Sequence, residues 1–66
     1  MHIGHLIHSV VEEKNITIVE FSRQLSCSRT NVYKIFERSS IDTSTLQRIS
    51  KILEHDFFKD ISNDML

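Results

Sequence analysis

The apolar residues of this chain recur at intervals of three and four positions, which is the spacing of a helix face and not that of a strand. The first series ends at Asn15, a residue type that tolerates the left-handed conformation found where helices stop. Its members are Ile3, Leu6, Ile7, Val10 and Val11. Because the same spacing returns in four later segments, the pattern predicts an all-α fold of five helices.

A capping box predicts where the second helix starts. Thr17 and Glu20 lie three positions apart, so the Thr17 hydroxyl can accept from the Glu20 N–H while the Glu20 carboxylate reaches back. Ile16 and Phe21 flank this box in the positions of a hydrophobic staple. We therefore expect a short helix at about 18–25, with a buried face made of Phe21, Ser22 and Leu25.

A break at 26–28 separates this helix from a third helix at about 29–38, which Ser28 caps. Cys27 lies within the break, and we interpret it as a small buried hydrophobic residue, with a reactive thiol as the alternative. The inward face of the third helix consists of Val32, Ile35 and Phe36. A short helix, a brief turn and a second helix with one apolar face are the parts of a helix-turn-helix.

Two more helices follow a loop at 39–41. The fourth, at about 43–54, starts after an Asp42 cap, and the fifth starts after Asp56. The inward face of the fourth helix is Leu46, Ile49 and Leu53, and the fifth helix carries Phe57, Phe58 and Ile61. The chain has no proline and one glycine, Gly4, a composition that suits closely joined helices.

Composition restricts the possible classes of protein. A chain of 66 residues has room for one domain and one modest core. Cys27 is the lone cysteine, which rules out an internal disulfide and a zinc site built from several cysteines. No run of apolar residues exceeds two, so neither a signal peptide nor a membrane span is indicated, and we expect a cytoplasmic protein.

The distribution of charge is more informative than the net charge of −1. Residues 17–41 hold four cationic side chains against two glutamates, Glu20 and Glu37, whereas the segments on both sides are net acidic. The four cations are Arg23, Arg29, Lys34 and Arg38. The predicted helix-turn-helix is therefore the basic part of the chain, which weakly favours a nucleic-acid partner.

The outward face of the third helix carries the candidate chemistry. At 100° per residue, Thr30, Tyr33 and Lys34 lie opposite the apolar face, Arg29 projects from the first turn, and Asn31 lies to one side. Such a helix fits the DNA major groove, where Arg can donate twice to guanine and Thr can contact the thymine methyl group. Lys can reach guanine or a phosphate. The alternative interpretation is an ordinary solvated face.

Small hydroxyl residues mark the helix starts and the loop after the third helix. Helix N-termini carry free N–H groups and a partial positive charge that suit a phosphate, and hydroxyl donors commonly position a protein on the DNA backbone. The candidate phosphate contacts are Thr17, Ser28, Ser39, Ser40 and Thr43.

Histidines recur every three residues near the start of the chain, at His2, His5 and His8. This spacing could support weak metal binding, but no fourth ligand accompanies it, and a polar stripe explains it equally well. The Ser, Cys and His residues show no spacing that would combine a nucleophile, a base and an oxyanion site. We therefore expect no metal, no cofactor and no enzymatic activity.

The span from Ile3 to Ile61 resembles the Cro/phage-repressor class of helix-turn-helix domains, the XRE family, without an internal gap. Phe21–Ser26 is similar to the family's Leu-Ala-x-x-Leu-Gly core, and Leu46–Leu53 is similar to its fourth helix. Cys27–Phe36 also resembles a bacterial subgroup common in gut Bacteroidetes. The resemblance implies a compact five-helix lambda-repressor-like fold with a central helix-turn-helix. It places the base-reading positions on Arg29, Thr30 and Lys34, with Asn31 and Tyr33 on flanking positions.

This chain departs from the family pattern at several positions. Ser26 stands at the usual turn glycine, which costs up to about 1 kcal/mol if that backbone is left-handed. Ile18 stands where many members carry a phosphate-binding glutamine, so that only its backbone N–H can serve. Val11 and Phe36 replace an Arg–Glu pair of several members, and we expect them to pack together.

Taken together, the sequence predicts a sequence-specific regulator of transcription, of the repressor type, that binds double-stranded DNA. A single small domain makes few phosphate contacts, so we expect a homodimer on a two-fold operator. The candidate dimer surface is the last helix with Phe58, Ile61, Met65 and Leu66; the alternative is that these residues close the core. The alternative is an antitoxin-like domain or another protein-interaction module of the same fold, with a toxin-like protein as its partner.

Overall fold

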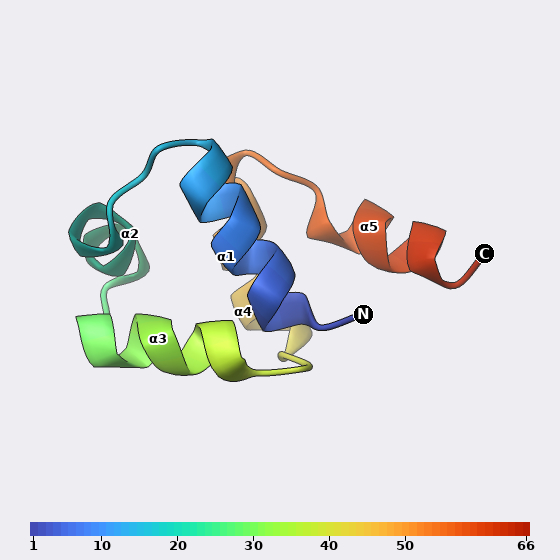
Figure 1. The fold of residues 1–66 in the computed structure, drawn as a ribbon, viewed down its shortest axis with the longest axis horizontal. Coiled ribbons are helices and arrows are strands. Elements are labelled where there is room, and N and C mark those ends of the chain that lie inside the picture. The colour runs from blue at the N-terminus through green and yellow to red at the C-terminus, as the bar shows by residue number, and fades with distance from the viewer.

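The computed structural model describes residues 1–66 and consists of five helices joined by short loops, with no strand (Figure 1). In chain order they are α1 (Ile3–Glu13), α2 (Ile18–Leu25), α3 (Arg29–Glu37), α4 (Thr43–Leu53) and α5 (Phe57–Asp64). The all-α fold predicted from the apolar spacing is confirmed. α3 and α4 each end one residue before the expected boundary, because Arg38 is extended (φ −81°, ψ 130°) and Glu54 is left-handed (φ 51°).

Each helix starts with a side chain that accepts a hydrogen bond from the backbone N–H three residues later, as the rules of N-capping require. The caps predicted at Thr17, Ser28, Asp42 and Asp56 are confirmed, with N···O distances of 3.1, 3.1, 2.9 and 3.0 Å. The sequence reasoning missed the cap of α1. There the His2 Nδ1 accepts from the His5 N–H at 3.1 Å, and the two imidazole rings stack with centroids 3.6 Å apart.

Left-handed residues turn the chain after three of the helices. They are Asn15, Ser26 and Glu54, with φ values of 58°, 56° and 51°. Asn15 was predicted to end the first helix, and Asn tolerates this conformation better than most residues. After Ser26, the Cys27 N–H donates to the Ser22 carbonyl at 3.0 Å, so the last carbonyls of α2 are satisfied within the turn.

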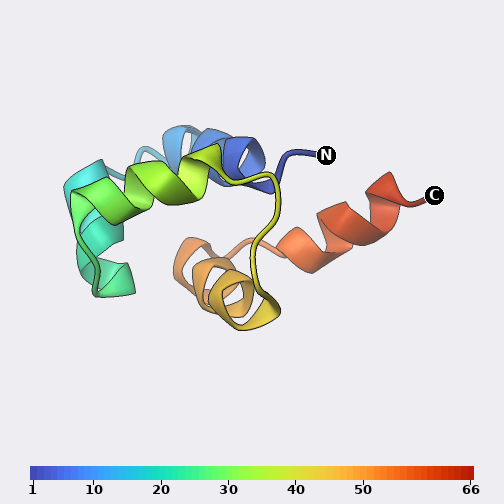
Figure 2. The ribbon, with the colours of Figure 1, turned by 90° about the horizontal axis from the view of Figure 1, so that it is seen from below.

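The hydrophobic core draws on all five helices and contains twelve buried residues. Figure 2 shows α1 and α3 on one side of the molecule and α4 on the other, with α2 at one end. α5 projects from the opposite end (Figures 1 and 2). It reaches the core through Phe57, which is fully buried. Phe58 on the same helix is 39% exposed, and Ile61 is half-buried.

The start of α1 is joined to the end of α3. The backbone N–H groups of Ile3 and Gly4 donate to the carbonyls of Ser39 and Arg38 at 3.2 and 2.8 Å. These N–H groups have no partner within α1, and the carbonyls they meet lie just beyond α3, so each helix end satisfies the other. None of the five helices has the length and apolar character needed to span a membrane.

Phe36 is the aromatic residue that joins α3 to α1 and α2. Its ring stacks on His8 of α1 with centroids 4.3 Å apart and lies 6.3 Å from the ring of Phe21 in α2. Val11, the expected partner of Phe36, is buried in the same core. His8 is therefore more than part of a polar stripe, because one face of its ring covers Phe36 while its Nε2 pairs with Glu12 at 2.9 Å.

Candidate nucleic-acid interface

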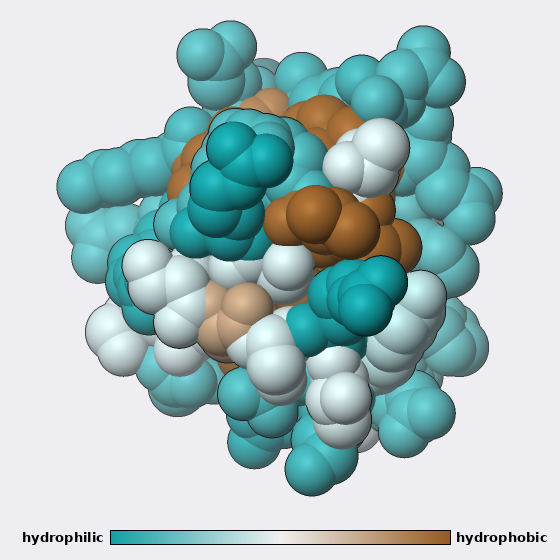
Figure 3. All heavy atoms as spheres, turned by 90° about the vertical axis from the view of Figure 1, so that its left-hand side faces the viewer, coloured by the Kyte–Doolittle hydropathy of each residue, from teal (hydrophilic) through white to brown (hydrophobic).

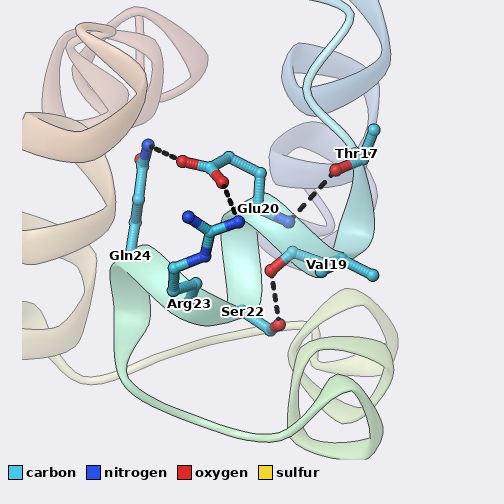
Figure 4. Close-up of polar contacts among 6 residues, drawn as sticks. All are labelled: Thr17, Val19, Glu20, Ser22, Arg23 and Gln24. Atoms are coloured by element: carbon cyan, nitrogen blue, oxygen red, sulfur yellow. Dashed lines mark hydrogen bonds and ion pairs between the residues drawn. The ribbon is translucent and has the colours of Figure 1, made fainter.

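The turn between α2 and α3 holds these two helices against a shared part of the core. Phe21 and Leu25 of α2 and Val32 and Phe36 of α3 are buried. Ser22 is also buried, and its hydroxyl is satisfied because it donates to the Val19 carbonyl at 2.8 Å (Figure 4). In Figure 1, α2 is seen nearly end-on while α3 lies across the view. This arrangement leaves one long face of α3 free.

The free face of α3 presents the three residues proposed from the sequence as base readers and the two proposed to flank them. Arg29, Thr30, Asn31, Tyr33 and Lys34 are all exposed. Neither cation of this group forms an ion pair within the chain, since the four salt bridges lie elsewhere. Tyr33 is 54% exposed and rests edge-on against Phe36, with centroids 6.3 Å apart. α3 thus offers uncommitted donors on a helix whose other face is anchored.

The hydroxyl residues proposed as phosphate contacts fall into two groups, two that cap α2 and α3 and three that follow α3. Thr17 and Ser28 cap α2 and α3; each oxygen accepts a backbone N–H, which leaves the hydroxyl hydrogen free to donate. Ser39, Ser40 and Thr43 are exposed in and just after the loop that follows α3. Ser39 and Ser40 border a groove of about 260 Å³, which Met1 and residues of α5 also line.

A fixed negative charge lies beside one of these hydroxyl residues. Hydrogen bonds from the Ser44 hydroxyl and from the Thr45 N–H and hydroxyl hold the pKa of Asp42 at about 2, below its ordinary value of 3.8. The carboxylate is therefore charged at neutral pH and directly precedes Thr43. This charge repels a phosphate at Thr43, so the structure supports Thr43 less well than the other four hydroxyl residues.

The reciprocal half of the predicted capping box is wrong. The Glu20 carboxylate does not reach back to Thr17. It accepts instead from Arg23 at 2.9 Å and from Gln24 at 3.0 Å, on the next turn of α2 (Figure 4). Two side-chain donors on its own helix compete with the single backbone donor at the cap. Arg23 is consequently the one paired cation of the basic segment.

The sequence reasoning missed a groove of about 400 Å³ between α3 and α4. Arg38 and Arg48 border it together with Asn31 and Lys34, which were predicted as part of the reading face. The Arg48 guanidinium donates to the Leu25 carbonyl at 2.8 Å and so ties α4 to the end of α2. The spacing of residues 31, 34 and 38 on one helix stripe could have suggested half of this groove. Arg48 joins it only through the tertiary fold.

The end of the molecule formed by α2 and the start of α3 is mainly hydrophilic, with a small hydrophobic area within it (Figure 3). Cys27, near this end, is half-buried against the core and borders the α3–α4 groove. No cluster of three or more His, Cys, Asp or Glu side chains is placed to hold a metal ion.

A capped short helix, a left-handed turn and an anchored helix with a polar outer face, within five helices, define a helix-turn-helix protein. The sequence model of the Cro/C1-type HTH DNA-binding domain matches residues 7–63. The chain therefore belongs to the Cro/C1-type family of DNA-binding helix-turn-helix domains. Comparisons with curated proteins and with solved structures found no match.

Proposed function

We propose that the 66 residues act as one domain that binds specific double-stranded DNA sequences and regulates transcription as a repressor, with α3 in the major groove. The observation that carries this proposal is the free face of α3, which exposes two cations that form no ion pair and three neutral polar side chains. A helix of 9 residues is about 14 Å long and fits within the groove.

Within this proposal, Arg29, Thr30 and Lys34 contact base edges. Arg29 lies in the first turn of α3, where a long side chain can reach the floor of the groove and donate twice to guanine. Asn31 and Tyr33 lie on the two flanks of this face and contact the groove walls. We also infer that the chain belongs to the bacterial subgroup suggested by the Cys27–Phe36 block.

Thr17, Ser28, Ser39 and Ser40 are the proposed phosphate contacts, with a smaller contribution from Thr43 because of the neighbouring Asp42 charge. Hydroxyl contacts of this kind fix the register of a protein on the duplex without reading sequence. Ser28 lies at the start of α3 and Ser39 and Ser40 follow its end, so these hydroxyls would hold the reading helix at both ends.

We propose that the active form is a homodimer that joins through α5. Phe58 and Met65 are 39% and 81% exposed, and Leu66 is fully exposed. α5 projects away from α2 and α3 (Figure 2), so a second copy could pack there without covering the reading face. Half-sites about 34 Å apart on one side of the duplex match such a dimer.

The proposal is tested by selecting duplexes from a random library with the purified protein and sequencing those retained. We expect two inverted half-sites about one helical turn apart. Alanine variants of Arg29, Thr30 and Lys34 are then measured on the selected site and on duplexes with single mismatches. Arg29→Ala should cost about 1–3 kcal/mol on the selected site and relax the preference at one or two base positions.

Circular dichroism accompanies each variant, because exposed side chains should be removable without loss of helix content. Selection of solitary asymmetric sites, bound by a monomer in sedimentation, would remove the dimer from the proposal and leave α3 as the reader. If all three variants bind every duplex as the wild type does, α3 is not the reader and a protein-interaction function takes its place.

A further inference from the structure

The groove between α3 and α4 has one dominant property, which is the number of cations that border it. Lys34 comes from α3, Arg38 directly follows α3, and Arg48 comes from α4; none of the three forms an ion pair. No carboxylate borders the groove. In a chain with a net charge of −1, this is an unbalanced concentration of positive charge.

Asp42 does not border the groove, but it contacts Thr45, which does. It accepts from the Thr45 hydroxyl at 2.8 Å. That bond uses the Thr45 hydroxyl hydrogen, so Thr45 does not donate into the groove. The free polar donors are therefore the Asn31 amide, the Lys34 ammonium and the two guanidinium groups.

Arg48 is held in position by a bond within the protein. One of its terminal nitrogens donates to the Leu25 carbonyl at 2.8 Å. A guanidinium has five N–H donors, so this contact fixes the planar group and leaves donors for an anion. A ligand therefore meets an ordered cation, which reduces the entropic cost of binding.

The size and lining of the groove indicate the class of ligand. Guanidinium groups match the oxygen geometry of phosphate and bind it with paired charge-assisted hydrogen bonds. A volume of about 400 Å³ lies at the lower end of ligand pockets. Leu25, Cys27 and Ile35 form its less polar part, which leaves room for a small group attached to the phosphate.

We propose that the α3–α4 groove is an anion site that binds a phosphate group through Arg38 and Arg48, with Lys34 on the border that the groove shares with the free face of α3. The phosphate comes either from the DNA backbone, in which case the site rests on the proposed function, or from a small phosphorylated molecule. In either case the site is separate from the hydroxyl contacts, and it links α2, α3 and α4 around one ligand.

The first experiment uses the full chain without DNA and inorganic pyrophosphate as the ligand, with potassium chloride at matched ionic strength as the reference. We expect saturable NMR shifts at the amides of Cys27, Lys34, Arg38 and Arg48. Arg38→Met should weaken binding about tenfold or more, because it removes one charge-assisted contact. The Arg38 side chain forms no hydrogen bond within the chain, so this variant should fold normally.

Lys51→Met is the matched control, since it removes one cation from α4 outside the groove. It should bind pyrophosphate as the wild type does. Arg48→Met also loses the bond to Leu25. Its binding result is therefore interpreted only if its circular dichroism spectrum and melting temperature are unchanged. Arg38→Met is the decisive variant.

The second experiment distinguishes the two sources of phosphate by the salt dependence of binding to a duplex of arbitrary sequence. If a backbone phosphate fills the groove, Arg38→Met lowers the slope of log K against log salt by about one and pyrophosphate competes with DNA. If the ligand is a small molecule, pyrophosphate binds in the first experiment and Arg38→Met leaves the slope unchanged.

Equal shifts with pyrophosphate and chloride, together with a salt slope that Arg38→Met does not change, would overturn the proposal. Equal weakening of pyrophosphate binding by Arg38→Met and Lys51→Met would overturn it too, because the effect would then come from the overall charge of the protein and not from the groove. The pyrophosphate titration needs no DNA, so its result is independent of whether α3 reads sequence.

Discussion

Gly4 in the first turn of α1 lies directly against the backbone of Ile35 in α3. A Cβ added to Gly4 would lie 2.4 Å from the Ile35 carbonyl oxygen and 2.4 Å from that of Phe36. Both atoms belong to a helix backbone and cannot rotate aside. The glycine is thus required by the close approach of two helices, and its backbone conformation is an ordinary helical one.

Gly4→Ala should therefore lower the free energy of unfolding, although alanine is intrinsically the better helix former by about 1 kcal/mol. The added methyl group forces α1 away from α3, and overpacking of this kind typically costs about 1–3 kcal/mol. Thermal and urea unfolding followed by circular dichroism measure the change. Ser9→Ala, at an exposed position of the same helix, is the control and should leave stability nearly unchanged. A Gly4→Ala protein more stable than wild type would contradict this packing.

Phe36→Ala should unfold much of the population at ambient temperature. Phe36 is 5% exposed and stacks on His8 and Phe21, and removal of a buried phenyl ring costs about 3–5 kcal/mol. A domain of this size has little stability to lose. Tyr33→Ala removes an aromatic ring from the exposed side of the same helix and serves as the comparison. Similar urea midpoints for the two variants would show that Phe36 is not a core residue.

Ser26→Gly should raise stability. Ser26 is left-handed, with φ 56°, and this conformation costs a residue with a side chain about 1 kcal/mol more than it costs glycine. Gln24→Gly, two positions earlier in α2, should have the opposite effect because glycine weakens a helix interior by about 1 kcal/mol. The two variants have the same product residue, so opposite shifts of melting temperature show that position 26 favours glycine where a helix interior does not; Gln24→Gly also loses the hydrogen bond to Glu20.

Asp42 should make stability depend on pH at the acid end. Its pKa is lowered to about 2 from 3.8, so the folded state favours the charged carboxylate. The resulting stabilisation is complete above pH 3.8 and is lost as pH falls through about 2. Melting temperatures of wild type and Asp42→Asn, measured from pH 7 to pH 1.5, should differ by a constant amount near neutrality and converge at the acid end. A constant difference across the range would exclude this role.

Lys34 and Ser40 should differ in how they affect binding to DNA. Removal of a cationic phosphate or base contact lowers the salt slope by about one, whereas removal of a neutral hydroxyl does not. Lys34→Ala is therefore expected to reduce the slope, and Ser40→Ala is expected to weaken binding equally on all sequences at an unchanged slope. Fluorescence anisotropy at four salt concentrations gives both quantities. Equal slopes for Lys34→Ala and wild type would place Lys34 away from the DNA.

Local signals in the sequence were sufficient for most of the fold. Four capping residues predicted where helices start, because a cap acts over only three residues. Apolar spacing predicted the ends of α3 and α4 to within one residue. Contacts between helices were not predictable in this way. The His8–Phe36 stack and the approach of Gly4 to Ile35 join residues about 30 positions apart, and no local pattern records them.

The candidate site likewise has one part that was predictable from local sequence and one part that depends on contacts between helices. The outward face of α3 follows from helix geometry alone, so Arg29, Thr30 and Lys34 could be proposed from their spacing. The α3–α4 groove needs α4 to lie against the end of α2, which is a tertiary fact. Nothing local in the sequence distinguishes Arg48 from other exposed cations on helices, although its guanidinium donates to the Leu25 carbonyl.

The backbone bonds from Ile3 and Gly4 to Ser39 and Arg38 close residues 3–39 into a ring of three helices. The amide hydrogens at a helix start ordinarily exchange rapidly with solvent, yet these two are bonded to the end of another helix. Neither α1 nor α3 can fray at this junction without releasing the other. The two amides should therefore exchange at the rate of a shared cooperative opening, and the reading helix keeps its last turn for as long as the amino end of the chain stays in place.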